Sequence, residues 1–353
     1  MMRLTVIWFL MAWSTIVWTQ DVRFHNINEN LSDINPALIS SPKGFTVIGF
    51  GYREALNLAK SQSIATASNI SPNRLSTVYG IRTFAINKLD VITLEARIKD
   101  DNPKNGLVAR TDALMSFRYA KLLGSRGKNY QKLSIGTSIG LRMTRLTNAE
   151  FWFGSQYDIL NERVDLGIPS GEISINQLSN RTGLDLSLGL AWTSHIHGVG
   201  DYYLSIAAFH LNPYNQAMYE GGSLPIERRY SVLVGLRKIL SKKATWINTL
   251  MYEQQNVFAA VSLRTTAQYK VDEDTSVAIG LMPILRDSSE GVQFNSLNVF
   301  TAFHVRNIQL NISYDIGFGA ISSVTDGRGS LELGIRYYFG RIELEEERLG
   351  DLY

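Results

Sequence analysis

The chain has 353 residues, of which 45% are hydrophobic and 19% charged, with a formal net charge of +3 and no cysteine. The lack of cysteine excludes disulfides, thiolate metal sites and a lipid-modified N-terminal cysteine, and the small charge gives no reason to expect a nucleic-acid partner. With 28 glycines, 8 prolines and 10% aromatic residues, the composition favours an all-β protein. It does not separate a soluble exported protein from a membrane protein.

Residues 1–19 are predicted to form a secretory signal peptide. A Met-Met-Arg start precedes an apolar run from Leu4 to Trp18, and short side chains just before Gln20 suit a signal peptidase. The alternative, an uncleaved anchor, would need a longer apolar run. No later window reaches the roughly 18 apolar residues of a membrane-spanning helix, so a helical membrane protein is excluded.

Apolar and polar side chains alternate along several segments of the remaining chain, for example over residues 133–141, 184–192, 308–316 and 331–339. A period of two is typical of β-strands with one apolar face. The second face carries polar or very small residues. These segments run to about nine to eleven residues, the length a tilted strand needs to cross a bilayer, whereas strands of a soluble sandwich usually have about five or six. The pattern therefore predicts a transmembrane antiparallel up-and-down β-barrel in the outer membrane of a Gram-negative bacterium.

About fourteen such segments can be counted, an even number as closed bacterial barrels require. They lie near residues 43–51, 73–83, 89–98, 110–120, 131–143, 184–193, 201–211, 229–238, 244–252, 257–269, 275–284, 292–304, 307–317 and 329–340.

The connections between these segments alternate between short and long, as periplasmic turns and external loops of such barrels do. The short connections are 85–88, 194–200, 240–243, 270–274 and 305–306, and the long ones are 52–72, 99–109, 144–183, 212–228, 285–291 and 318–328. The connection near 253–256 breaks the rule, because it should be external and is short. A soluble sandwich gives no reason for this alternation.

The predicted barrel spans residues 43–340. Residues 20–42 are expected to form an N-terminal periplasmic segment, and residues 341–353 an acidic C-terminal tail. A frayed, solvated end is the simpler interpretation of the tail, and a periplasmic docking segment is the alternative.

The connection 144–183 contains Phe151, Trp152, Phe153 and Tyr157 in a mostly polar stretch. Exposed aromatic side chains there would suit contacts with a partner. The alternative is that they pack on the mouth of the barrel or belong to an interfacial aromatic girdle.

The sequence carries no clear catalytic, cofactor-binding or metal-binding pattern, and the protein is not expected to be an enzyme. His195 and His197 have the spacing of strand neighbours on one face, but they lie in a short turn with no nearby carboxylate, so a metal site is not expected there. Inward-facing charges are expected to pair across the lumen rather than line an open channel. They are Asp185, Arg237, Glu332 and Arg336.

Five short motifs follow one another in an order that resembles a known family. They are Asn35-Pro36-Ala37, Leu133-Ser134-Ile135-Gly136, Phe209-His210-Leu211, Tyr314-Asp315 and Gly329-Ser330-Leu331-Glu332. Together they resemble the PorP/SprF family of Bacteroidota outer-membrane proteins, which is associated with type IX secretion and gliding motility. Leu331 stands where the family usually has His.

The resemblance implies a non-enzymatic outer-membrane barrel that supports type IX secretion or surface attachment of large, adhesin-type secreted proteins. The implied partners are outer-membrane lipid, a secreted adhesin-type protein or its C-terminal domain, and a periplasmic peptidoglycan-binding protein, with no nucleic acid and no cofactor. The alternative is an outer-membrane channel for small or hydrophobic solutes, similar to fatty-acid channels. Those channels have a long N-terminal plug, and the roughly 22 residues after Gln20 are too few for a sizeable plug domain. A soluble periplasmic sandwich is a third possibility.

Overall fold

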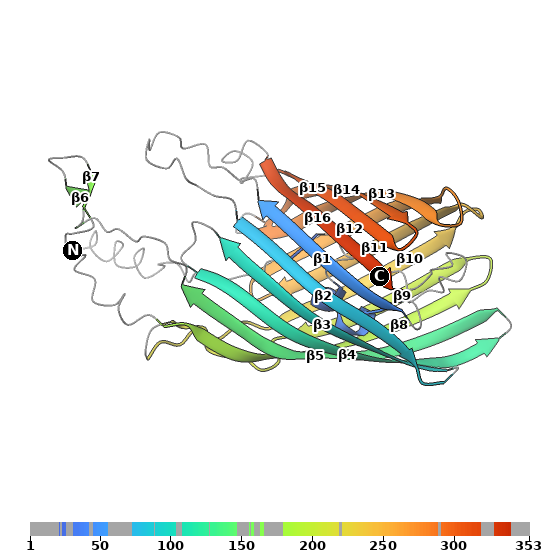
Figure 1. Cartoon of the computed structure of the whole chain (residues 1–353), viewed down its shortest axis with the longest axis horizontal. Coiled ribbons are helices and arrows are strands. Elements are labelled where there is room, and N and C mark those ends of the chain that lie inside the picture. Colours follow the sequence, from blue (N-terminus) through green and yellow to red (C-terminus); the bar gives the residue numbers. More distant parts are fainter. Residues whose placement is uncertain are drawn as a thin grey trace.

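The computed structural model describes fifteen stretches of the chain. These are residues 21, 23–25, 31–41, 45–55, 73–87, 89–103, 108–126, 128–146, 155, 157–158, 163–165, 179–218, 221–288, 291–318 and 328–339. Fourteen antiparallel strands close into one barrel, in which each strand pairs with its neighbours along the chain and β1 pairs with β16 (Figure 1). The predicted fold class and strand count are confirmed.

The barrel strands have the following bounds: β1 (Thr46–Ala55), β2 (Asn73–Ala85), β3 (Asp90–Pro103), β4 (Val108–Arg126), β5 (Asn129–Leu146), β8 (Arg181–Ile196), β9 (Gly200–Phe209), β10 (Arg229–Ile239), β11 (Ala244–Gln255), β12 (Phe258–Lys270), β13 (Thr275–Ser288), β14 (Gly291–Val305), β15 (Ile308–Gly317) and β16 (Arg328–Phe339). A separate two-stranded pair, β6 (Tyr157–Asp158) and β7 (Arg163–Val164), lies in the connection between β5 and β8. The residues described ahead of β1 include two short helical turns, α2 (Leu31–Ile34) and η2 (Pro36–Leu38).

The alternation in the sequence sets which side chains face out. On β8, for example, Leu188 and Leu190 are 46% and 44% exposed, whereas Asp185 and Ser187 are buried. The same arrangement recurs around the ring, so the outer surface carries a band of exposed apolar side chains and the lumen is lined by polar and small ones. This is the arrangement that lipid requires, because a barrel in water would turn its apolar face inward.

Connection lengths follow the predicted parity, with differences at two of the long connections. At one end of the barrel every connection is short, from 86–89 to 306–307, and the other end carries the long ones, 56–72, 147–180, 210–228 and 318–327. The connections 104–107 and 289–290 are shorter than expected because their flanking strands extend further. In barrels of this kind the end with short turns faces the periplasm. None of the described helices is long and apolar enough to cross a membrane.

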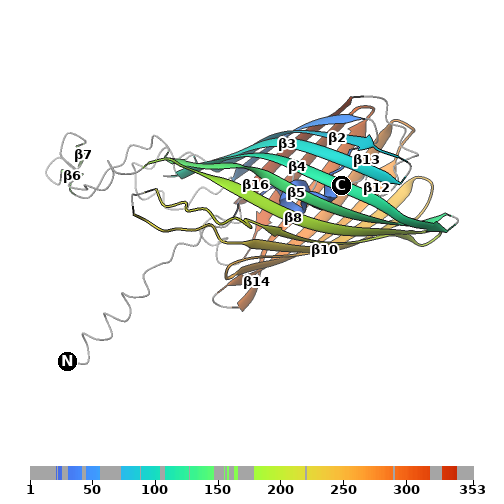
Figure 2. The same cartoon turned by 90° about the horizontal axis from the view of Figure 1, so that it is seen from below.

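The described part of the segment 20–42 lies inside the barrel, not in the periplasm ahead of it. Leu31 to Ile39 are buried, and η2 contacts the inner faces of β4, β5, β8 and β9. Figures 1 and 2 show this short blue segment within the ring of strands. The main apolar core of the protein forms around it, because Leu31, Ile34 and Ile39 pack with luminal residues of β8 to β11. The expected location was wrong because strand alternation gives no information about a segment that crosses the lumen.

Candidate functional site

The lumen is the candidate functional site, and the described residues 21, 23–25 and 31–41, here called the luminal segment, occupy it. Asn35 shapes its centre. The Asn35 side-chain oxygen accepts a hydrogen bond from Ala37 N at 2.8 Å and caps η2, and Pro36 occupies the first turn, where a missing N–H costs nothing. The amide nitrogen of Asn35 donates to the carbonyl oxygens of Leu190 and Ile206, at 3.1 Å and 2.9 Å. One side chain therefore folds the segment and attaches it to the β8–β9 wall.

Two glycines in the wall make room for this turn. A Cβ atom at Gly136 on β5 would lie 2.3 Å from the carbonyl carbon of Pro36, and one at Gly189 on β8 would lie 1.9 Å from Asn35 Oδ1. Contacts this short cannot be relieved at Gly136 without moving backbone, since the obstructing atoms belong to the main chain. The Asn-Pro-Ala motif and the Leu-Ser-Ile-Gly motif are thus two sides of one contact.

Asp33 fixes the helical turn that precedes Asn35. Its carboxylate pairs with Arg97 and, at 3.1 Å, with Lys99, both from β3. From the opposite wall, Arg229 of β10 donates to the Asp33 carbonyl oxygen at 2.8 Å. These contacts hold the turn between β3 and β10. Moving the turn away would leave buried charges without partners, which is strongly destabilising.

Asp21 forms a second attachment point, nearer the end with the long connections. Its carboxylate lies 2.9 Å from Arg142 Nη1 and 2.6 Å from His210 Nε2. The other ring nitrogen of His210 lies 2.9 Å from Asp185 Oδ1, so this buried histidine bridges two carboxylates. The next residue, Leu211, donates its backbone N–H to Leu186 O at 2.9 Å. The His-Leu motif therefore ends β9 where the luminal segment begins.

His25 forms the third attachment point. Its backbone N–H donates to Glu332 Oε1 at 2.8 Å, and its Nδ1 lies 2.6 Å from Asp315 Oδ2. Ser330 donates to the same Asp315 oxygen, and Arg53 lies 3.4 Å from both carboxylates. The residues from the last two motifs, on β15 and β16, thus converge on one residue of the luminal segment.

The carboxylates of Asp315 and Glu332, with the His25 ring, lie close enough to hold a metal ion. The arrangement fits ion pairing better, because a guanidinium already contacts both carboxylates and a backbone N–H occupies one of them. Two further motif residues flank this cluster. Tyr314 lies at the irregularity in the β15–β16 pairing, and Gly329 lies against the main chain of Asp315.

The other candidate residues from the sequence are distributed as follows. Phe151, Trp152 and Phe153 lie outside the described residues, and Tyr157 lies in β6, where it is 41% exposed. The statement that His195 has no nearby carboxylate was wrong: Asp201, which follows it across the turn into β9, contacts His195 Nδ1.

Each of the four inward charges singled out from the sequence has a partner in the part of the chain that the structure describes. Arg237 lies 3.5 Å from Asp201, and Asp185 lies 3.6 Å from Arg142. Glu332 pairs with Arg53, and Arg336 Nε donates to the Tyr79 hydroxyl at 2.6 Å. Asp201, Arg142 and Arg53 lie on the strand next to that of their partner, and Tyr79 lies on β2, two strands from Arg336. Sequence spacing gives no signal for these contacts.

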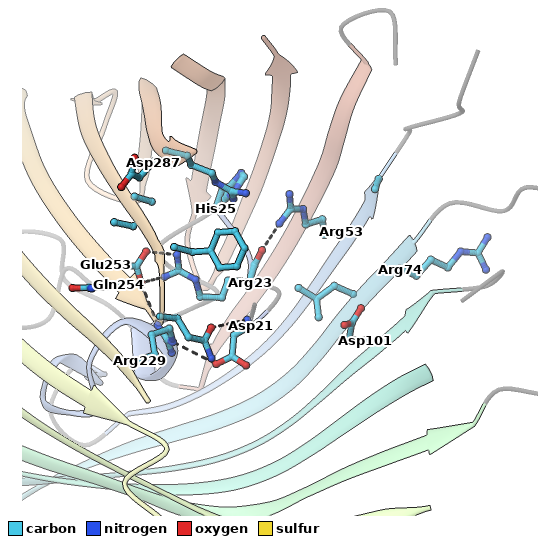
Figure 3. A pocket seen from close by; sticks show the side chains of 17 residues that line it. Asp21, Arg23, His25, Arg53, Arg74, Asp101, Arg229, Glu253, Gln254 and Asp287 are labelled. Atoms are coloured by element: carbon cyan, nitrogen blue, oxygen red, sulfur yellow. Dashed lines mark hydrogen bonds and ion pairs between the residues drawn. The ribbon is translucent and has the colours of Figure 1, made fainter. Parts of the chain in front are cut away.

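A cavity of about 270 Å³ with a mixed polar and apolar lining, here called the vestibule pocket, opens beside the luminal segment. Arg23 forms its centre and pairs through two nitrogens with Glu253 of β11, which also lies 3.2 Å from Arg229 (Figure 3). Arg53 lies across the pocket from this pair, and Phe258, Ala259 and Ala260 of β12 supply an apolar part of the wall.

A protein-family model described as "Type IX secretion system membrane protein PorP/SprF" matches residues 100–337. No curated protein matches the sequence.

The solved structures to which the chain is similar include outer-membrane channels and transporters. The Ralstonia pickettii toluene transporter TbuX is 9% identical, with 87% of this chain and 92% of that chain covered and a TM-score of 0.48. The CymD monoaromatic hydrocarbon channel is 12% identical, with 89% and 93% covered and a TM-score of 0.48. An outer-membrane channel from Pseudomonas putida F1 is 12% identical, with 90% and 99% covered and a TM-score of 0.41.

Proposed function

Because the chain belongs to the PorP/SprF family of type IX secretion system membrane proteins, we propose that this outer-membrane β-barrel supports secretion or surface attachment of large, adhesin-type secreted proteins. The family match carries the proposal, since it covers two thirds of the chain, from β3 to β16. The proposed role is non-enzymatic. The proposed partners are a secreted adhesin-type protein or its C-terminal domain on the outside and a peptidoglycan-binding protein in the periplasm.

The way the lumen is filled supports a scaffold. Contacts of the luminal segment reach β3, β8, β10, β11, β15 and β16, strands that lie on opposite sides of the ring. A barrel whose interior holds a fastened segment keeps its shape and presents its loops and turns at fixed positions. That is a useful property in a protein that positions others at the membrane.

Gene deletion tests the proposal. In the source bacterium, removing the gene is expected to lower the amount of at least one large secreted protein at the cell surface and to increase it in the periplasm. Surface proteomics and periplasmic fractionation measure both, and the wild-type gene supplied in trans should restore them. Unchanged surface display of every secreted protein would contradict the proposal.

A channel for small or hydrophobic solutes is the alternative function. It predicts steady ion or solute passage through the purified barrel, whereas a scaffold filled by its own segment predicts little. Conductance across a planar bilayer therefore distinguishes the two functions without any knowledge of the secreted protein.

A further inference from the structure

Arg286 on β13 lines the vestibule pocket and differs from the other arginines there. Arg286 is half-buried. In the strand register it pairs with Ala260 on β12 and with Gln293 on β14. Within the described stretches of the chain, its guanidinium has no hydrogen bond or ion pair. Arg23 and Arg53, by contrast, are each paired with carboxylates.

The surroundings of Arg286 oppose its charge. Burial opposes the charge most, the like charges of Arg23 and Arg53 add to this, and Glu253 and Asp315 offset it only in part. A guanidinium has five N–H donors, of which Arg23 uses two on Glu253. Arg23, Arg53 and Arg286 all line this pocket, so the N–H donors that Arg23 and Arg286 do not use within the described residues lie around one small volume.

We propose that the vestibule pocket binds a carboxylate carried on a small, partly apolar group, such as a peptide chain end or an acidic side chain. Arg286 makes the main contact, because a guanidinium matches a carboxylate in planar, two-bond geometry. Arg23 and Arg53 add N–H donors, and Phe258, Ala259 and Ala260 cover the apolar part of the ligand. A cavity of about 270 Å³ suits a group of one residue, being smaller than the roughly 300–1,000 Å³ typical of drug-sized ligands. The inference does not depend on the proposed role in secretion.

Calorimetric titration of the folded, detergent-solubilised barrel tests it. The probes are N-acetyl-leucine for a chain-end carboxylate, N-acetyl-glutamate α-amide for a side-chain carboxylate, and N-acetyl-leucinamide as the uncharged match. We expect one or both acids to bind and the amide not to bind, and the tighter acid identifies the source of the carboxylate. Equal binding of acid and amide, no binding of either acid, or displacement by an equal concentration of sulfate would overturn the proposal.

Variants locate the site. Arg286→Gln should weaken acid binding by about tenfold or more, as expected for loss of a charge-assisted pair. Arg145→Gln, at a half-exposed arginine outside the pocket, should leave it unchanged. Glu253→Gln releases Arg23 from its carboxylate and should tighten acid binding several-fold, which general structural damage would not do. The faster gel migration of an unheated, folded barrel shows that each variant has folded. If Arg286→Gln bound the acids as tightly as the wild-type protein does, the acids would bind somewhere other than at Arg286, and the proposal would be wrong.

Discussion

Single residues determine how closely the luminal segment approaches the wall. Gly136 and Gly189 leave space for the Pro36 main chain and the Asn35 side chain, and Asn35 uses both ends of its amide. The side chains of Asp21, His25 and Asp33 then attach the segment to the wall through Arg142, Asp315 and Arg97. The short motifs that carry the family resemblance are thus largely explained by contacts with this segment.

Adding one methyl group at Gly136 should destabilise the protein. Gly136→Ala places a Cβ against the backbone of Pro36 and Ala37, and overpacking of this kind costs about 1–3 kcal/mol in the free energy of unfolding. Gly80→Ala is the matched control, because a Cβ there meets no atom within 4 Å, and it should change the free energy by less than about 0.5 kcal/mol. Urea unfolding in lipid vesicles, followed by gel mobility, measures both. Equal effects at the two positions would show that the segment does not press on β5.

At the level of elements, the strands could be predicted and the luminal segment could not. Period-two alternation identifies all fourteen strands because each has one face in lipid. It misplaces their ends, as at β4, which runs to Arg126 rather than 120, because charged and small residues beyond the lipid carry no alternation. The luminal segment has no such period, and it is held by contacts between residues as distant in sequence as Asp21 and His210. Only the Asn-Pro-Ala motif marked it, and nothing in the sequence indicated what that motif contacts.

The orientation of the barrel can be tested with single cysteines, since the chain has none of its own. Ser223, exposed in the connection between β9 and β10, lies at the end with long connections, and Lys242, exposed between β10 and β11, lies at the end with short turns. In intact cells, a membrane-impermeant maleimide should label Ser223→Cys and not Lys242→Cys, and both should react after lysis. Labelling of Lys242→Cys alone in intact cells would show that the barrel has the opposite orientation in the membrane.

For the whole molecule, the ring of strands and the luminal segment form one structure. The outer apolar band fixes the barrel in lipid, and the main apolar core lies between the luminal segment and the wall. The vestibule pocket remains at the end with the long connections, beside Arg53 and Arg286. The described residues therefore form a barrel whose lumen holds the luminal segment, with the vestibule pocket beside it.

Conductance of the purified barrel in planar bilayers tests this central claim most directly. The wild-type protein should give no steady pores, because the luminal segment is fastened by Asp21, His25 and Asp33. The double variant Asp21→Asn, Asp33→Asn removes two of these attachments and should conduct intermittently, with folding confirmed by gel mobility. Steady, open-pore conductance from the wild-type barrel would contradict the account and favour a channel.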